Sequence, residues 1–199
     1  IAESNGLIVK IGKFVLHEAI QNLLHWQSMT GLSLNMAVNL SPIQLRDHNF
    51  VKYMDNLISK TGVSASCLEL EITEGVLMSG YSDIKTSITE LKQLGLRLAM
   101  DDFGTGYSSL SYLRNYPFDV IKIDREFIFD IEEDNSDCKL AQATIAIASS
   151  LELKVVAEGV ETEGQLKILA GYGCDYAQGY LFSKAKPADE ITMQLEEQS

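Results

Sequence analysis

Residues 100–109 read Met-Asp-Asp-Phe-Gly-Thr-Gly-Tyr-Ser-Ser and follow an apolar run that predicts a buried strand. Asp101 and Asp102 therefore stand where a strand ends and a glycine-rich loop begins. The alternation of side chains loosens at a strand end, so both acids can face one cavity, and close carboxylates need a positive charge between them. Such oxygen clusters usually hold Mg²⁺, Mn²⁺ or Ca²⁺. An ordinary turn explains the composition equally well, whereas a dinucleotide-binding fingerprint would need glycine at Ser109.

The overall composition limits the classes of protein to consider. The chain has 199 residues, 46% of them hydrophobic, which is enough for one sizeable core. Its net charge of −12 and pI near 4.6 argue against binding of a DNA or RNA polymer. A small phosphorylated ligand bound through metal ions remains compatible with this charge. No apolar run approaches the roughly 20 residues of a membrane span.

Cysteine usage and the start of the chain bear on its location. Cys67, Cys138 and Cys174 are odd in number and widely spaced, which fits a reducing, cytoplasmic compartment better than a disulfide scaffold. The three histidines are too scattered for a zinc site. The first residues lead directly into a helical pattern without a signal peptide, so we expect this domain to be part of a larger protein. Other segments of that protein could anchor it to a membrane.

Apolar periodicity alternates regularly between strands and helices along the whole chain. This order predicts a parallel sheet with right-handed crossovers. Glycines end three of the expected helices, Pro117 ends another, and Thr162 with Gln165 has the spacing of a capping box. The first expected strand ends near Asn39. The other five cover residues 68–74, 96–100, 120–124, 154–158 and 176–182.

Each expected strand ends in a residue that can bind a metal ion or a phosphate. In a (β/α)₈ barrel all carboxyl ends face one mouth, whereas an open doubly wound sheet gathers only the strands near its switch point. Because six strands contribute in turn, the pattern favours the barrel. These strand-end residues are Asn39, Glu71, Asp101 with Asp102, Lys122, Glu158 and Gln178.

Each of these residues has an ordinary structural explanation when taken alone. Asn39 could belong to a turn, Glu71 could pair with a surface lysine, and Lys122 could be a solvated charge. The acidic residues from Glu132 to Asp137 are interpreted as a solvated loop and helix start, because acids favour helix N-termini. The strand-end set differs from such cases, because solvent has no reason to select the same end of every strand.

Four carboxylates and an amide around one cavity predict a divalent-metal site. Two ions roughly 3.5–4 Å apart would suit in-line attack on a phosphodiester. Lys122 could orient the attacking water or stabilise developing charge. Glu158 could be a metal ligand or the proton acceptor, and the sequence does not choose between these roles.

The chain resembles the EAL domain family, bacterial phosphodiesterases that hydrolyse cyclic di-GMP to the linear dinucleotide pGpG. The resemblance covers nearly the whole chain and implies a TIM-like (β/α)₈ barrel. The similar segments are Asn39-Leu40-Ser41-Pro42, Glu69-Leu70-Glu71-Ile72-Thr73-Glu74, 101–113, Lys122-Ile123-Asp124, 157–162 and Gln178-Gly179-Tyr180.

The resemblance also implies roles for individual residues and a two-metal site for Mg²⁺ or Mn²⁺. The implied metal ligands are Asn39, Glu71, Asp101, Asp102 and Glu158, with Lys122 and Glu158 as catalytic residues. The implied substrate-binding residues are Ser41, Glu161 and Gln178. A regulatory loop with a homodimer surface is implied around Glu74, Phe103, Gly104, Thr105 and Gly106.

Some features depart from the family pattern. The Glu-Ala-Leu segment, whose glutamate is normally a metal ligand, does not occur before the first helix, and Ile43 stands where the family often has arginine. About six of eight barrel strands are countable. We therefore expect a catalytic domain truncated at its N-terminus over residues 1–199, with weak or no activity on its own. The alternatives are a cyclic di-GMP receptor without catalysis, or a protein-interaction scaffold.

Overall fold

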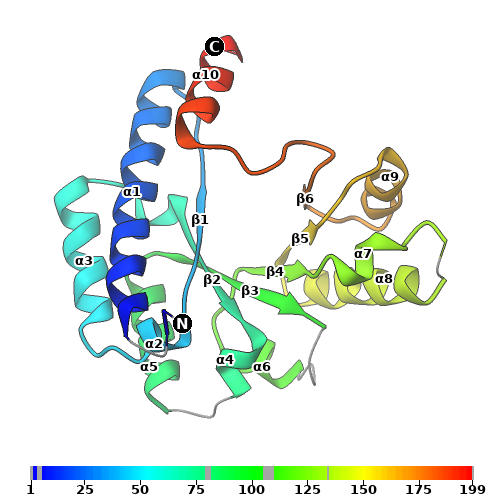
Figure 1. Ribbon diagram of the computed structural model, residues 1–199. Coiled ribbons are helices and arrows are strands. Elements are labelled where there is room, and N and C mark those ends of the chain that lie inside the picture. Colours follow the sequence, from blue (N-terminus) through cyan, green and yellow to red (C-terminus); the bar gives the residue numbers. More distant parts are fainter. Residues whose placement is uncertain (1, 4–5, 79–81, 105–109, 134, 199) are drawn as a thin grey trace.

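The computed structural model describes residues 2–3, 6–78, 82–104, 110–133 and 135–198. Its described strands form one parallel sheet in which every strand lies beside its neighbour in the chain. The sheet is curled into part of a TIM-like barrel, with six of the eight strands (Figure 1). In order these strands are β1 (Met36–Asn39), β2 (Leu68–Thr73), β3 (Arg97–Phe103), β4 (Val120–Ile123), β5 (Lys154–Glu158) and β6 (Tyr176–Gln178).

Helices connect the strands and cover the convex face of the sheet, and α10 lies beside one end of α1 (Figure 1). There the Trp26 Nε1 donates a hydrogen bond of 2.9 Å to Thr192 Oγ1. None of the described helices combines the length and apolarity needed to cross a bilayer. The helices are α1 (Leu7–Thr30), α2 (Pro42–Leu45), α3 (Phe50–Thr61), η1 (Ala65–Cys67), α4 (Glu74–Met78), α5 (Ser82–Gln93), α6 (Leu110–Asn115), α7 (Glu126–Phe129), α8 (Asn135–Ser150), α9 (Glu163–Gly171) and α10 (Ala188–Gln198).

Apolar and acidic side chains alternate along β2, so they point to opposite faces of the sheet, one toward the core and one toward the site. Leu68, Leu70 and Ile72 are fully buried in the layer between the sheet and its helices. Glu69 points to the opposite, concave side, where it forms an ion pair with Arg97 of 3.2 Å (Oε2 to Nε) and lines a cavity of about 230 Å³. The strictly alternating sequence of β2 thus places its acids inside the partial barrel.

Two aspartates fasten the amino ends of neighbouring strands. The Asp119 carboxylate accepts a hydrogen bond of 2.8 Å from the Leu98 amide and pairs with Lys92. Asp175 repeats the arrangement one connection later, accepting from the Val155 amide at 3.0 Å and pairing with Lys154 at 2.6 Å. Burial alone would raise the pKa of Asp175, but the bonds from Lys154 and Val155 outweigh it and lower that pKa.

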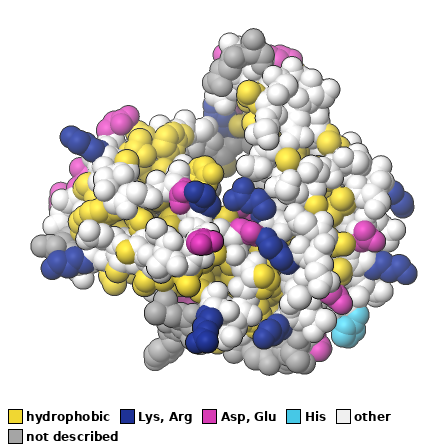
Figure 2. Space-filling view, turned by 180° about the vertical axis from the view of Figure 1, so that it is seen from behind, with side chains coloured by type: hydrophobic (Ala, Val, Ile, Leu, Met, Phe, Trp, Pro, Cys, Tyr) yellow, Lys and Arg dark blue, Asp and Glu magenta, His cyan; other side chains and the backbone are white. Residues whose placement is uncertain are grey.

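The surface carries no continuous basic area on the face shown in Figure 2. Lys and Arg side chains stand among acids there, and hydrophobic side chains gather mainly on the side that carries α8 and α9. This mixed charge fits the net charge of −12. A polymer of nucleic acid would instead need a cationic surface to neutralise its phosphates.

Most expected elements are confirmed, but two strand boundaries differ from the expectation. β3 continues through both acids to Phe103, and β6 ends at Gln178 well before residue 182. The four- and five-residue helices α2, α4 and α7 were not expected, because such short segments show no helical period. Pro42, which follows the expected strand end near Asn39, opens α2.

Candidate active site

Lys122 is the centre of the strand-end cluster. Its side chain is 5% exposed, and its Nζ lies 2.6 Å from Glu71 Oε1, 2.7 Å from Glu158 Oε1 and 3.2 Å from Asp101 Oδ1. The four residues come from β2, β3, β4 and β5, which are consecutive in the sheet. The structure therefore brings these four predicted site residues together at the carboxyl ends of the strands.

The cluster is held by one cation among several acids. Burial alone would lower the pKa of Lys122, but its hydrogen bonds to Glu158 and Glu71 and their charges outweigh burial and raise it. Lys122 is therefore charged at neutral pH. Burial raises the pKa values of Glu71 and Glu158, and the neighbouring Lys122 partly opposes this rise. Each of these acids depends on the Lys122 ammonium group to offset the cost of burying its negative charge.

A backbone irregularity lets the adjacent acids Asp101 and Asp102 serve neighbouring parts of the site. The pairing of β3 with β4 shifts register between Met100 and Phe103. Asp102 has φ +56°, a left-handed conformation that aspartate tolerates better than most residues. Asp101 is 7% exposed, and its Oδ1 accepts no hydrogen bond among the described residues although Lys122 Nζ is near. That buried oxygen has unused capacity for a cation.

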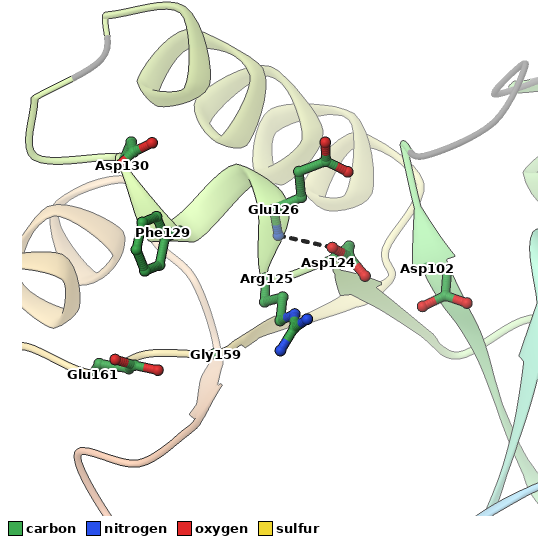
Figure 3. A pocket seen from close by; sticks show the side chains of 8 residues that line it. All are labelled: Asp102, Asp124, Arg125, Glu126, Phe129, Asp130, Gly159 and Glu161. Carbon is green, nitrogen blue, oxygen red and sulfur yellow. Dashed lines mark hydrogen bonds between the residues drawn. The ribbon is translucent and has the colours of Figure 1, made fainter.

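A cavity of about 740 Å³ adjoins the cluster and is lined by Asp102, Asp124, Arg125, Phe129 and Glu161, among others. Figure 3 shows Arg125 and Phe129 extending from α7 and its start toward the loop that carries Glu161. Asp124 Oδ1 accepts a hydrogen bond of 2.7 Å from the Glu126 amide. The volume lies within the roughly 300–1,000 Å³ that is typical of small-ligand sites.

Asp102 and Asp124 form a second close pair of acids at this cavity. Burial raises the pKa of Asp102, and the charges of Asp101 and Asp124, together with a hydrogen bond to Asp124, raise it further. Two carboxylates in such contact share either a proton or a cation. The structure thus places two neighbouring acids at this cavity, next to the Lys122 cluster.

Glycines allow the chain to approach closely on the far side of the cavity. Gly159, at φ +70°, follows Glu158, and a Cβ there would press against the Arg125 side chain. Glu158 pairs in register with Gln178, and both line a cavity of about 380 Å³ together with Glu161. A Cβ on Gly179 would collide with the Val160 backbone. The predicted residues Glu161 and Gln178 therefore lie beside Glu158.

Asn39 and Ser41 lie at the other end of the described sheet. Asn39 pairs in register with Glu71, and it lines a cavity of about 750 Å³ between α1 and β1 together with Ser41. Ser41 caps α2, because its Oγ accepts from the Ile43 amide at 3.2 Å. Its hydroxyl also donates to Glu3 Oε1 at 2.6 Å. The structure brings Asn39 next to the cluster, whereas Ser41 lies away from Glu161 and Gln178.

The predicted regulatory segment is described only in part. Glu74 begins α4, is 3% exposed, and has no hydrogen-bond partner for either carboxylate oxygen among the described residues. Phe103 ends β3 and is buried, and Gly104 follows at φ +102° beside Phe127. Thr105 and Gly106 lie outside the described residues.

The chemistry of the donors fits hard divalent cations. Among the described residues, no three His, Cys, Asp or Glu side chains are grouped so that they could hold a metal ion as they stand, and the Lys122 ammonium occupies the point where the acids converge. The charges nevertheless leave a deficit. Among the described side chains of the site, the acids Glu71, Asp101, Asp102, Asp124 and Glu158 outnumber the cations Lys122 and Arg125. The oxygen donors suit Mg²⁺ or Mn²⁺, and among them Asp101 Oδ1 accepts no hydrogen bond from the described residues.

Of the residues that line the cavity of about 740 Å³, sequence reasoning predicted only Asp102 and Glu161 as site residues, and Asp124 and Arg125 are among those it missed. Asp124 stands two positions after Lys122, so the period of a strand places it on the same side of the sheet. That signal was available in the Lys-Ile-Asp segment. Arg125 carries no comparable signal, because its position depends on α7, which the sequence pattern did not indicate.

Comparison with known proteins places these findings in a wider context. A family model described as EAL domain matches residues 1–185. A signalling protein of Caulobacter vibrioides, described as uncharacterised, is 44% identical over 193 residues, which cover 97% of this chain and 23% of that protein. The cyclic di-GMP phosphodiesterase NbdA of Pseudomonas aeruginosa is 43% identical over 187 residues, which cover 94% of this chain and 24% of NbdA. The chain spans about a quarter of the length of these curated relatives.

Solved structures show the same fold with ligand. The PaMucR phosphodiesterase, solved as a c-di-GMP complex, superposes with a TM-score of 0.90 at 39% identity. The match covers 96% of this chain and 77% of the solved chain. The arrangement of strands and helices is therefore similar to that of a phosphodiesterase whose structure was solved in complex with c-di-GMP.

Proposed function

Because this chain belongs to the EAL domain family, we propose that it catalyses metal-dependent hydrolysis of cyclic di-GMP to linear pGpG in bacterial second-messenger signalling. The observation that carries the proposal is the convergence of Glu71, Asp101 and Glu158 on Lys122 beside a cavity of about 740 Å³. NbdA and the PaMucR structure support the choice of substrate. The chain covers about a quarter of the length of its curated relatives, so the activity of the whole protein is part of this proposal.

The acids and the amide at the strand ends would hold the metal ions. We assign this role to Asn39, Glu71, Asp101, Asp102 and Glu158. When bound, Mg²⁺ or Mn²⁺ supplies positive charge for the phosphodiester and lowers the pKa of a water molecule. Without such cations, the net negative charge of the site would repel an anionic dinucleotide.

The remaining roles fall to residues around the ions. Lys122, charged and buried, orients the attacking water or stabilises the charge that develops on the phosphate. Glu158 either joins the metal ligands or accepts the proton of that water. Glu161 and Gln178 contact the substrate from the loop after β5 and the end of β6. Ser41 keeps its proposed substrate contact only if the ligand extends toward β1.

Direct turnover separates the proposal from its alternatives. The protein that contains this chain is incubated with cyclic di-GMP and Mg²⁺ or Mn²⁺, and products are followed by liquid chromatography with mass detection. We expect pGpG, with loss of turnover in EDTA and in Lys122→Met. Lys154→Met, which removes an exposed lysine at the amino end of β5, away from the carboxyl ends that carry the site, is the matched control and keeps its rate.

The other outcomes assign the other functions. Binding of cyclic di-GMP without pGpG would contradict catalysis and support a receptor. If the protein neither binds nor cleaves cyclic di-GMP, the scaffold interpretation is the one that remains. An undiminished rate in Lys122→Met would remove this residue from the mechanism. Homodimerisation stays a prediction, which the molar mass of the protein in solution can test. A cytoplasmic location also stays a prediction, and cell fractionation can test it.

A further inference from the structure

Gln165 uses every hydrogen-bonding position of its side-chain amide. It lies in the first turn of α9 and is 4% exposed. Its Oε1 accepts from the amides of Glu161 at 2.7 Å and Thr162 at 3.1 Å. Its Nε2 donates to the carbonyl oxygens of Ile128 and Phe129, both at 3.1 Å. A capping box needs only the Oε1 half, so the Nε2 bonds serve a different purpose.

The two segments that Gln165 joins both line the cavity of about 740 Å³, from different sides. Phe129 ends α7, and Glu161 lies in the loop between β5 and α9. Figure 3 shows both side chains at the same end of the cavity, one from each segment. Gln165 lies behind these walls and is absent from the cavity lining. Its single amide group therefore fixes the separation between the two walls without touching what lies between them.

Further contacts hold the same loop in place. Thr162 Oγ1 donates to Glu132, and a Cβ on Gly164 would collide with the Glu132 carboxylate, so this acid covers the first turn of α9. The Val160 amide donates to the Gln178 carbonyl oxygen at 3.0 Å on the other side. Glu132 is exposed in a turn, as expected of a loop acid, and it also contacts the start of α9. Gln165 is the member of this set that reaches α7.

We propose that Gln165 is a positioning residue for the cyclic dinucleotide, which sets the distance between Phe129 and Glu161 so that the ligand enters a cavity of fixed width. The inference rests on the proposed function. Walls that are already ordered reduce the cost of ordering on binding. Lys122 and Glu158 lie on strands that are held by the sheet itself, so loss of this bridge should affect binding more than the chemical step.

The variant Gln165→Glu separates the two halves of the amide. Its carboxylate keeps the acceptor for Glu161 and Thr162, but it places an acceptor oxygen against two carbonyl oxygens and loses the bridge to α7. The control is Asp119→Ala, which breaks a hydrogen bond to Leu98 at the opposite end of the strands. Both variants are assayed as part of the whole protein, well below their melting temperatures.

We expect Gln165→Glu to raise KM for cyclic di-GMP about tenfold while kcat falls less than about threefold, since one tenfold step corresponds to about 1.4 kcal/mol of lost binding free energy. Hydrogen exchange of the backbone amides around Phe129 should rise. Asp119→Ala should lower Tm and leave KM unchanged. A KM within twofold of the wild type in Gln165→Glu, or an equal rise in Asp119→Ala, would overturn the inference while wild-type turnover upholds the proposed function. A wild-type protein that neither binds nor cleaves cyclic di-GMP would overturn both.

Discussion

Replacing Lys122 with methionine removes the cation that three acids share, two of them buried and the third, Glu158, partly exposed. The Nζ lies within 3.2 Å of Glu71, Asp101 and Glu158, and Glu71 and Asp101 are 6% and 7% exposed. Breaking a buried ion pair from one side costs about 3–5 kcal/mol. A second estimate of this loss in unfolding free energy agrees with the first. Protonating one glutamate at pH 7, starting from a pKa near 4.3, costs about 3–4 kcal/mol.

The expected loss depends on pH and on divalent cations. In Lys122→Met the acids keep raised pKa values without their cation, so the folded state is favoured by protonation at low pH and loses that stability as the pH rises. The loss at pH 5 should therefore be about 1 kcal/mol, because protonating a glutamate is then cheap. Mg²⁺ at about 100 times its Kd should restore about 2.7 kcal/mol.

Urea unfolding followed by Trp26 fluorescence in EDTA, at pH 5 and pH 7 and then with Mg²⁺, measures these free energies. Lys154→Met is the control, since its ammonium is exposed and its loss should depend on neither Mg²⁺ nor the cluster. A Lys122→Met variant within about 1 kcal/mol of the wild type at pH 7 in EDTA would refute the reasoning. Equal stabilisation of Lys122→Met and the wild type by Mg²⁺ would refute it as well.

Three further substitutions test separate features. Gly179→Ala forces a Cβ into the Val160 backbone and should cost about 1–3 kcal/mol in urea unfolding, with weaker cyclic di-GMP binding; unchanged stability would contradict the close approach. Asp175→Asn should destabilise the protein by about 1 kcal/mol at pH 7, where the lowered pKa keeps the acid charged. That loss should disappear as the pH falls below about 3.8, which thermal unfolding across pH can check. Glu152→Gly, at φ +60°, should raise stability by up to about 1 kcal/mol, and a loss would show that Glu152 is not strained.

The strand-end pattern predicted much of the site because it depends on local sequence alone. Every apolar run ends at a fixed residue, and a parallel sheet brings those ends together, so Glu71, Asp101, Lys122 and Glu158 could be grouped before any coordinates were known. The capping box of Thr162 and Gln165 is confirmed for the same reason. Local spacing determines both features.

What the sequence did not predict depends on contacts between distant segments. The Nε2 bonds of Gln165 reach a helix 36 residues away, and no period in the sequence links the two. The central place of the Lys122 ammonium follows from side-chain geometry across four strands. The left-handed Asp102 arises from a register shift against β4, which a single strand does not reveal.

A crystal of the protein that contains this chain, grown with Mn²⁺ and cyclic di-GMP and measured at the manganese absorption edge, tests the central claim most directly. The account predicts anomalous peaks about 2.0–2.3 Å from carboxylate oxygens of Asp101, Asp102 and Glu71, with the dinucleotide in the cavity lined by Arg125 and Glu161. Manganese bound only at the outer surface, with Glu71 and Glu158 still paired to Lys122, would contradict it.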